Sequence, residues 1–260
     1  MDGTATYVYC ILHGAGAPRT VRVPAGLPAA TRPSIAAVTR SLSLVIATVP
    51  LESYGPGPLE TALQDMQWVA DVAVAHEAVV EHFARQAGVT VIPMKLFTMF
   101  TSDARAVEKT RARGRDLEAI AKRIAGCEEW AVRMTRRVAA SRPPGRGRDV
   151  KPQSGAAFLT AKKEARDAAR ASVQAAAESA QHAFATLATI ARDALRRDDV
   201  PEGATTPPLL DAAFLVPATR RARFKAAVRK LAATNAKAGA EMTLSGPWPS
   251  YNFVQEDGHS

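Results

Sequence analysis

The stretch from Phe158 to Arg197 contains neither proline nor glycine, and it limits the folds open to this chain more than any other segment. Its apolar residues recur every three or four positions, which places them on one side of a helix. Unbroken, the helix would extend for about 60 Å at 1.5 Å per residue. The same pattern also allows a kink or a break into two helices. The stripe consists of Ala165, Ala169, Ala176, Ala180, Phe184, Leu187, Ala191 and Leu195.

Segments rich in apolar and β-branched residues surround this helix and predict a sheet for the second half of the chain. A further helix is predicted over residues 217–236, and one weak strand is expected near Thr205. The resulting order, strand, helix, two strands, helix, strand, is that of a ferredoxin-like unit. The three clearer strands are Cys127–Val138, Leu209–Val216 and Ala240–Ser245.

The first half predicts a separate mixed arrangement of helices and strands. Strands are expected at 4–12 and 42–49, with a weaker one at 20–23. Helices are expected at 59–87, after a loop at Gly55–Pro58, and from Ser102 or Asp103 to Ile124, where Gly114 disfavours an unbroken helix. Residues 89–100 read as a strand that ends or bends at Pro93, because proline lacks a backbone donor.

These patterns predict an α+β protein of two domains, an N-terminal domain over 1–125 and a C-terminal ferredoxin-like domain over 126–260. A chain of 260 residues exceeds the usual size of a single core. Residues 141–155 combine prolines, glycines and basic side chains, so we expect a flexible basic loop inside the second domain.

The sequence argues against a secreted protein, a membrane-spanning protein and a cysteine-based metal or redox protein. The N-terminus lacks the basic and apolar regions of a secretory signal, and no apolar run is long enough to cross a membrane. The two cysteines, Cys10 and Cys127, lie far apart and match no metal-ligand or redox spacing. The sequence therefore predicts a cytoplasmic protein with no membrane contact.

The chain offers no recognisable catalytic or metal-binding constellation. His76 and His82 are six positions apart, so they point about 120° away from each other on a helix and cannot easily share a metal ion. His76 lies in the apolar stripe of its helix, which favours a core histidine bonded to a neighbouring strand. Nucleophile elbows and phosphate-binding loops are absent. We predict no enzymatic activity and no cofactor.

The net charge of +9 permits binding to nucleic acid or to an acidic protein. Basic residues gather around the 141–155 loop and along the 217–236 helix, but aromatic side chains that would stack on bases are missing from both. A solvated surface is the simpler interpretation. A basic nucleic-acid-binding or scaffold protein stays as the alternative function. The two clusters are Arg136, Arg137, Arg142, Arg146, Arg148 and Lys151, and Arg220, Arg221, Arg223, Lys225, Arg229 and Lys230.

Six strings along the chain are specific enough to compare with known families. They are TYVYCIL (6–12), HEAVVE (76–81), VIPMKLFTMF (91–100), CEEWAVRM (127–134), GAAFLTAKK (155–163) and LSGPWPSYNFV (244–254). In this order they resemble the motifs of the gas vesicle protein F/L family. The first is similar to the opening strand of that family, with Cys10 at a position usually held by glycine, and the second and third resemble its H-E-x-V…P-[ML] block, where Phe97 departs from the usual glycine.

The resemblance implies a two-domain α+β protein that acts in gas vesicle formation as an assembly or minor structural component. It implies the main gas vesicle shell protein as the partner, other accessory proteins as further partners, and a location in the cytoplasm and on gas vesicles. The family brings no catalytic residues. The motif positions, which we expect to be structural, are His76, Glu77, Pro93, Met94, Trp130, Gly246, Pro247, Trp248 and Tyr251.

Overall fold

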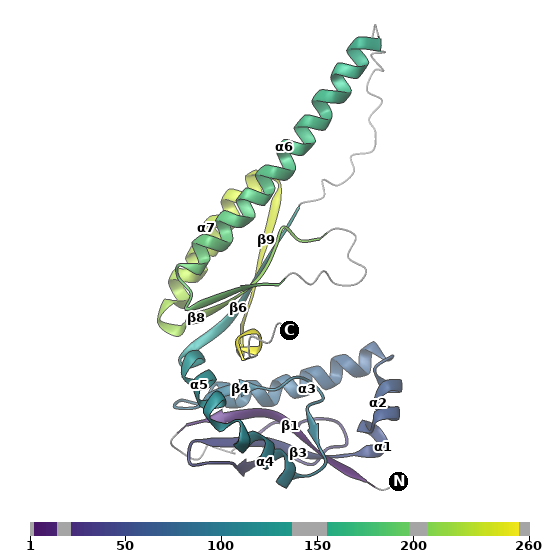
Figure 1. Cartoon of the computed structure of the whole chain (residues 1–260), viewed down its shortest axis with the longest axis vertical. Helices are drawn as coiled ribbons and strands as arrows, with labels where there is room; N and C mark the ends of the chain where they lie inside the picture. Colours follow the sequence, from purple (N-terminus) through teal and green to yellow (C-terminus); the bar gives the residue numbers. More distant parts are fainter. Residues whose placement is uncertain (1–2, 15–21, 137–154, 198–206, 255–260) are drawn as a thin grey trace. The chain divides into compact units, whose positions relative to one another are not determined.

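The computed structural model describes residues 3–14, 22–136, 155–197 and 207–254, and in this part the chain is a mixed α+β protein with two antiparallel sheets (Figure 1). Contacts divide it into two compact units. The first unit is Met1–Glu129 together with Pro247–Ser260, and the second is Trp130–Gly246. The predicted division into 1–125 and 126–260 differs from this one, because it assigns the C-terminal segment to the second domain. The domain limits stay a prediction.

The first unit is built on a five-stranded sheet. Its order is β2-β3-β1-β4, and β5 also pairs with β1. β1 is antiparallel to each of its partners. β1, β3 and β4 fall where the sequence predicts strands, and β4 ends at Pro93 as expected; β2 was not predicted. The strands are β1 (Thr4–His13), β2 (Ser34–Ala37), β3 (Leu42–Pro50), β4 (Thr90–Pro93) and β5 (Met99–Phe100).

Helices cover this sheet and complete its core. α3 packs Val72, Val79 and Phe83 against side chains of β1 and β3. α4 contacts β1, β2 and β5, and α5 contacts β4. The helices are α1 (Leu51–Tyr54), α2 (Pro56–Ala62), α3 (Met66–Ala84), α4 (Asp103–Ala112) and α5 (Gly114–Ile124).

The predicted helix over 59–87 is wrong in its continuity, and the predicted loop at 55–58 is wrong. α2 begins at Pro56, where the missing backbone N–H costs nothing in the first turn. α3 then restarts at Met66 because the side chain of Asp65 accepts hydrogen bonds from Gln67 N and Trp68 N. The second predicted helix is likewise divided, at Arg113, beside Gly114.

The second unit combines a four-stranded sheet with two helices. The sheet order is β7-β8-β6-β9. α6 and α7 both contact β8 and each other. Trp130, Phe214 and Phe224 are among the core side chains between the sheet and the helices. The elements are β6 (Cys127–Arg136), α6 (Gly155–Ala188), β7 (Asp193–Arg196), β8 (Leu210–Pro217), α7 (Arg221–Lys237) and β9 (Ala240–Trp248).

The long helix ends earlier than its apolar stripe suggests. α6 stops at Ala188, and residues 193–196 instead form β7, which pairs antiparallel with β8. The unit thus obtains its fourth strand from β7, whereas the weak strand predicted near Thr205 falls outside the described residues. The 141–155 loop lies outside them too, except for Gly155, and so does the start of the 20–23 strand.

Candidate functional site

A buried tyrosine–histidine pair lies at the centre of the first unit. Tyr7 on β1 and His76 on α3 are 0% and 3% exposed, and the Tyr7 hydroxyl lies 2.8 Å from His76 Nδ1. Phe97 N donates to the same hydroxyl at 3.3 Å. The hydroxyl has one proton and a second lone pair, so it can either donate to Nδ1 or accept from it, and the tautomer of His76 sets which group donates.

The surroundings of this pair suppress ionisation. Burial lowers the pKa of His76 to about 4, and the Met94 backbone opposes this shift only in part. Burial also raises the pKa of Tyr7 well above its usual value of 10. His76 Nε2 has no hydrogen-bond partner in the described part of the chain. The pair therefore joins β1 to α3 in neutral form and is sealed from solvent.

The next residue, Glu77, connects α3 to the C-terminal segment. The Tyr251 hydroxyl donates to Glu77 Oε2 at 2.6 Å. Burial raises the pKa of Glu77, the hydrogen bond from Tyr251 lowers it, and nearby Glu81 raises it. The pKa of Tyr251 is raised by its burial and by its bond to Glu77.

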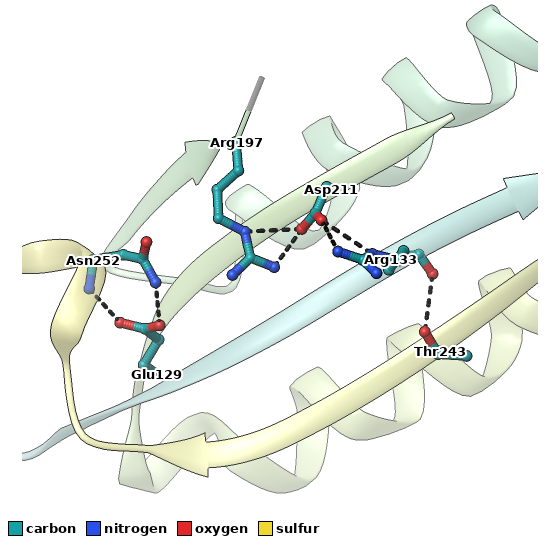
Figure 2. Close-up of polar contacts among 6 residues, drawn as sticks. All are labelled: Glu129, Arg133, Arg197, Asp211, Thr243 and Asn252. Carbon is teal, nitrogen blue, oxygen red and sulfur yellow. Dashed lines mark hydrogen bonds and ion pairs between the residues drawn. The ribbon is translucent and has the colours of Figure 1, made fainter. Parts of the chain in front are cut away.

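Two more contacts hold the same segment. Asn252 N donates to Glu129 Oε2 at 2.9 Å, and the Asn252 side-chain amide donates to the other carboxylate oxygen (Figure 2). Arg123 Nη2 donates to the Phe253 carbonyl oxygen at 2.6 Å. The motif that contains Tyr251 is thus tied to α3, α5 and β6 by side chains distant in sequence.

A cleft of about 610 Å³ lies beside this segment within the first unit. Pro93 and Met94 line it together with Tyr251, so three of the predicted motif positions meet at one place. Its apolar wall includes Ile92 and Leu117, and its cationic side chains are Lys95, Lys109 and Arg113. His76 and Glu77 are not among its lining residues.

The remaining motif positions lie elsewhere. Trp130 is 3% exposed in the core of the second unit, with Lys225 Nζ 5.5 Å from its ring centre. Gly246, with a φ of 120°, and Pro247 lie in β9, which Trp248 ends. The Trp248 side chain is 42% exposed, in contrast to the buried Trp130.

The second unit contains a polar cluster that the sequence did not predict. Asp211 on β8 has a side chain only 4% exposed and forms ion pairs with Arg133 on β6 and with Arg197 (Figure 2). Each guanidinium places two nitrogens on one carboxylate oxygen. The signal was a single acidic residue inside the otherwise apolar strand LLDAAFLV. The cluster neutralises a buried charge and leaves no carboxylate oxygen for a substrate.

The most exposed apolar surface of the second unit is the N-terminal half of α6. From 156 to 175 every described side chain is exposed, and Phe158, Leu159 and Val173 are 55%, 66% and 57% exposed. Figure 1 shows this half of α6 extending beyond α7 of the same unit. Phe158 and Val173 lie on the same side of the helix as Ala180 and Leu187, which are packed in the core.

The basic residues of α7 and of the turn before it are partly engaged within their own unit. Lys225 lies over Trp130, and Arg220 Nη1 donates to the Ile190 carbonyl oxygen at 3.2 Å. Of the basic residues predicted around the 141–155 loop, only Arg136 is described. No observation on the described residues favours a nucleic-acid surface over a solvated one.

Comparison with known proteins decides the family. Residues 5–255 match the family model described as "Gas vesicle synthesis protein GvpL/GvpF". The chain belongs to the GvpL/GvpF family. Gas vesicle protein L of Streptomyces sp. (strain CB03234) is 27% identical over 230 residues, which cover 84% of this chain and 83% of that relative.

Solved GvpF structures share the fold. The crystal structure of GvpF from Anabaena sp. PCC7120 superposes with a TM-score of 0.67 at 16% identity and covers 99% of both chains. GvpF from Microcystis aeruginosa gives a TM-score of 0.66 at 14% identity and covers 97% of this chain and 99% of the other. The GvpL/GvpF fold thus extends over nearly the whole chain.

The GvpL/GvpF assignment makes this a gas vesicle protein of a family that is not a known enzyme family. Within the described ranges, no three or more His, Cys, Asp or Glu side chains are grouped so that they could hold a metal ion. None of the helices in those ranges is long and apolar enough to cross a membrane.

Proposed function

We propose that this protein is a cytoplasmic assembly factor or minor structural component that binds the main gas vesicle shell protein and supports vesicle nucleation or formation. The observation that supports this proposal best is the uncovered apolar side of α6 between residues 156 and 175. Other gas vesicle accessory proteins are further proposed partners.

The exposed half of α6 has the chemistry of a binding surface. Its Phe158, Leu159 and Val173 side chains are a little over half exposed, so each would contribute about 1–2 kcal/mol if a partner buried it fully. The same stripe already packs against the core farther along the helix. A helix with one apolar side typically docks into a groove or against another helix.

The partner chemistry follows from what a gas vesicle requires. A shell subunit must present an apolar side to the gas, and such a surface promotes aggregation before assembly. Charged residues lie both among and beside the apolar positions of α6: Lys162 and Arg166 follow Phe158 by four and eight positions, and Lys163 and Arg170 lie next to this side of the helix. They would keep the protein in solution while its apolar side covers that of the shell subunit.

Co-purification with the shell protein tests this proposal. We expect a variant with Phe158→Ser, Leu159→Ser and Val173→Ser to retain at most about a tenth of the shell protein that the unchanged chain retains. The matched control is Met66→Ser with Val74→Ser, because these side chains are 75% and 70% exposed but lie on α3 of the first unit. Equal retention by both variants would refute the role of α6.

A second experiment separates the two proposed roles. Mass analysis of washed, intact vesicles would show stoichiometric retention if the protein is a lasting structural component. Loss on washing, combined with binding to the free shell subunit, would support a chaperone-like role. Unchanged vesicle yield after deletion of the gene, with no complex detected, would exclude both.

We further infer that the second unit is a modified ferredoxin-like unit within a two-domain protein. Two observations support it: the order β6-α6-β7-β8-α7-β9 along the chain and the order β7-β8-β6-β9 in the sheet. Four strands and two helices in that sequence are the components of such a unit. Limited proteolysis that yields a stable fragment starting near residue 126 would support the domain limits.

A further inference from the structure

The cleft of the first unit combines an apolar wall with cations. Ile11, Ile92 and Leu117 are 3%, 2% and 4% exposed, so this part of the wall is rigidly packed. Lys95, Lys109 and Arg113 are exposed, and no acidic residue is among the lining residues. A ligand that matches both parts has apolar groups beside at least one negative charge.

The cations come from two separate elements. Lys95 lies in the turn between β4 and β5, whereas Lys109 and Arg113 are four positions apart at the C-terminal end of α4. Residues with this spacing lie on one side of a helix, about 5–6 Å apart at Cβ. The positive charge is therefore distributed along the cleft, which suits more than one carboxylate on an extended ligand.

One hydroxyl group of the cleft favours an amide donor on the ligand. Thr98 Oγ1 donates to the Lys95 carbonyl oxygen at 2.7 Å, so it has spent its proton within the protein and retains only lone pairs. The hydroxyl of Thr110 is buried and donates to the Ala106 carbonyl oxygen at 2.8 Å. Lone pairs match the N–H groups of a peptide, whereas a fatty-acid chain offers no such donor.

We propose that this cleft binds a short acidic and apolar peptide segment of a second protein. The volume of about 610 Å³ lies within the range of about 300–1,000 Å³ that is usual for small-ligand sites. The C-terminal segment forms one wall through Tyr251 and Asn252, which the Glu77 and Glu129 contacts hold in place. The site belongs to the first unit and is independent of the shell-protein surface proposed on α6.

Fluorescence anisotropy with a defined probe tests this site. The probe is a fluorescein-labelled, end-capped pentapeptide of sequence Leu-Asp-Leu-Glu-Val, titrated with the full chain at low salt, where surface electrostatics are least screened. A second probe carries lysine in place of both acidic residues. We expect the acidic probe to bind at least about tenfold more tightly than the basic one.

Charge-reversal variants locate the binding. We expect Lys109→Glu and Arg113→Glu each to weaken binding of the acidic probe by about tenfold. Arg115→Glu is the matched control, because Arg115 is exposed on α5 and does not line the cleft; it should change affinity by less than about twofold. All three positions are exposed, and unchanged thermal melting would verify the fold of each variant.

Three results would overturn the proposal. The first is the absence of saturable binding of the acidic probe at millimolar concentration. The second is an equal loss for Arg115→Glu and Lys109→Glu, which would show attraction to overall charge instead of a site. The third is binding of decanoate as tightly as the pentapeptide, because decanoate supplies a carboxylate and an apolar tail without amide groups.

Discussion

The Tyr251 hydroxyl donates to Glu77 Oε2 at 2.6 Å across 174 positions of sequence, and this contact ties the C-terminal motif to α3. Burial raises the pKa of Glu77, and the Tyr251 hydrogen bond lowers it. The ionised carboxylate therefore depends on Tyr251 as its donor. Removing the donor should be most costly at a pH where Glu77 is charged.

We accordingly expect Tyr251→Phe to lower the free energy of unfolding by about 1–2 kcal/mol at pH 8 and by less at pH 4. Folding raises the pKa of Glu77, so protonation of this carboxyl stabilises the folded state. That stabilisation is fully present below the ordinary pKa of 4.5 and is lost as pH rises through the pKa of the folded state. Urea denaturation at both pH values measures the difference. Tyr54→Phe is the control, since Tyr54 donates to the neutral Pro28 carbonyl oxygen and its loss should not vary with pH.

His76 predicts the opposite pH dependence. The pKa of His76 falls from 6.5 to about 4 on folding, so the stability that the neutral imidazole provides is present above pH 6.5 and is lost as pH falls towards 4. The free energy of unfolding lost over this range is at most about 3 kcal/mol. We expect His76→Gln to be less stable than the unchanged chain at pH 7, with a gap that narrows between pH 6.5 and 4. A constant gap in denaturation curves over that range would contradict the neutral, buried state of His76.

The backbone conformation of Phe97 should lower the stability of the protein. Its φ is 63°, in the left-handed region that favours glycine, and its ring stacks on Trp68 with centroids 5.9 Å apart and planes inclined by 2°. Phe97→Ala and Phe97→Gly both remove the ring, but only glycine relieves the backbone. We expect Phe97→Gly to exceed Phe97→Ala in thermal stability by about 1 kcal/mol. The reverse order would show that the backbone at this position relaxes.

The three residues of the Asp211 cluster should contribute unequally to the stability of the second unit. Asp211→Asn removes the charge from a side chain 4% exposed and should cost about 2 kcal/mol, since its arginine partners can still reach water. Arg133→Gln should cost less, because Arg133 is 49% exposed and Arg197 still neutralises the aspartate. Chemical denaturation of both single variants and the double variant would measure the coupling. A larger loss for Arg133→Gln than for Asp211→Asn would contradict this ranking.

The local sequence pattern predicted most helices and strands. It failed where a residue distant in the sequence determines the secondary structure. Leu195 fits the apolar stripe of α6, so periodicity cannot show that residues 193–196 leave the helix. They form β7 because β8 offers backbone groups for pairing, with Leu195 opposite Ala213. Similarly, the apolar stripe of the predicted 59–87 helix continues before and after Asp65. Only the hydrogen bonds that the Asp65 carboxylate accepts show that a new helix, α3, begins there.

The site shows the same limit. The position of His76 in the apolar stripe predicted a core histidine, but Tyr7 lies 69 positions earlier and could not be named from spacing. Pro93, Met94 and Tyr251 were singled out as motif positions, whereas their meeting at one cleft depends on the C-terminal segment returning to the first unit. The cations Lys95, Lys109 and Arg113 gave no signal, because exposed basic residues are common along this chain.

Site-specific photo-cross-linking tests the binding role of α6 most directly. A benzoylphenylalanine placed at Leu159 reports on the exposed half of α6, and one placed at Met66 reports on an equally accessible apolar position of the first unit. With the shell protein present during assembly, we predict an adduct between the two proteins from position 159 and none from position 66. No adduct from position 159, or equal yields from both positions, would contradict the account.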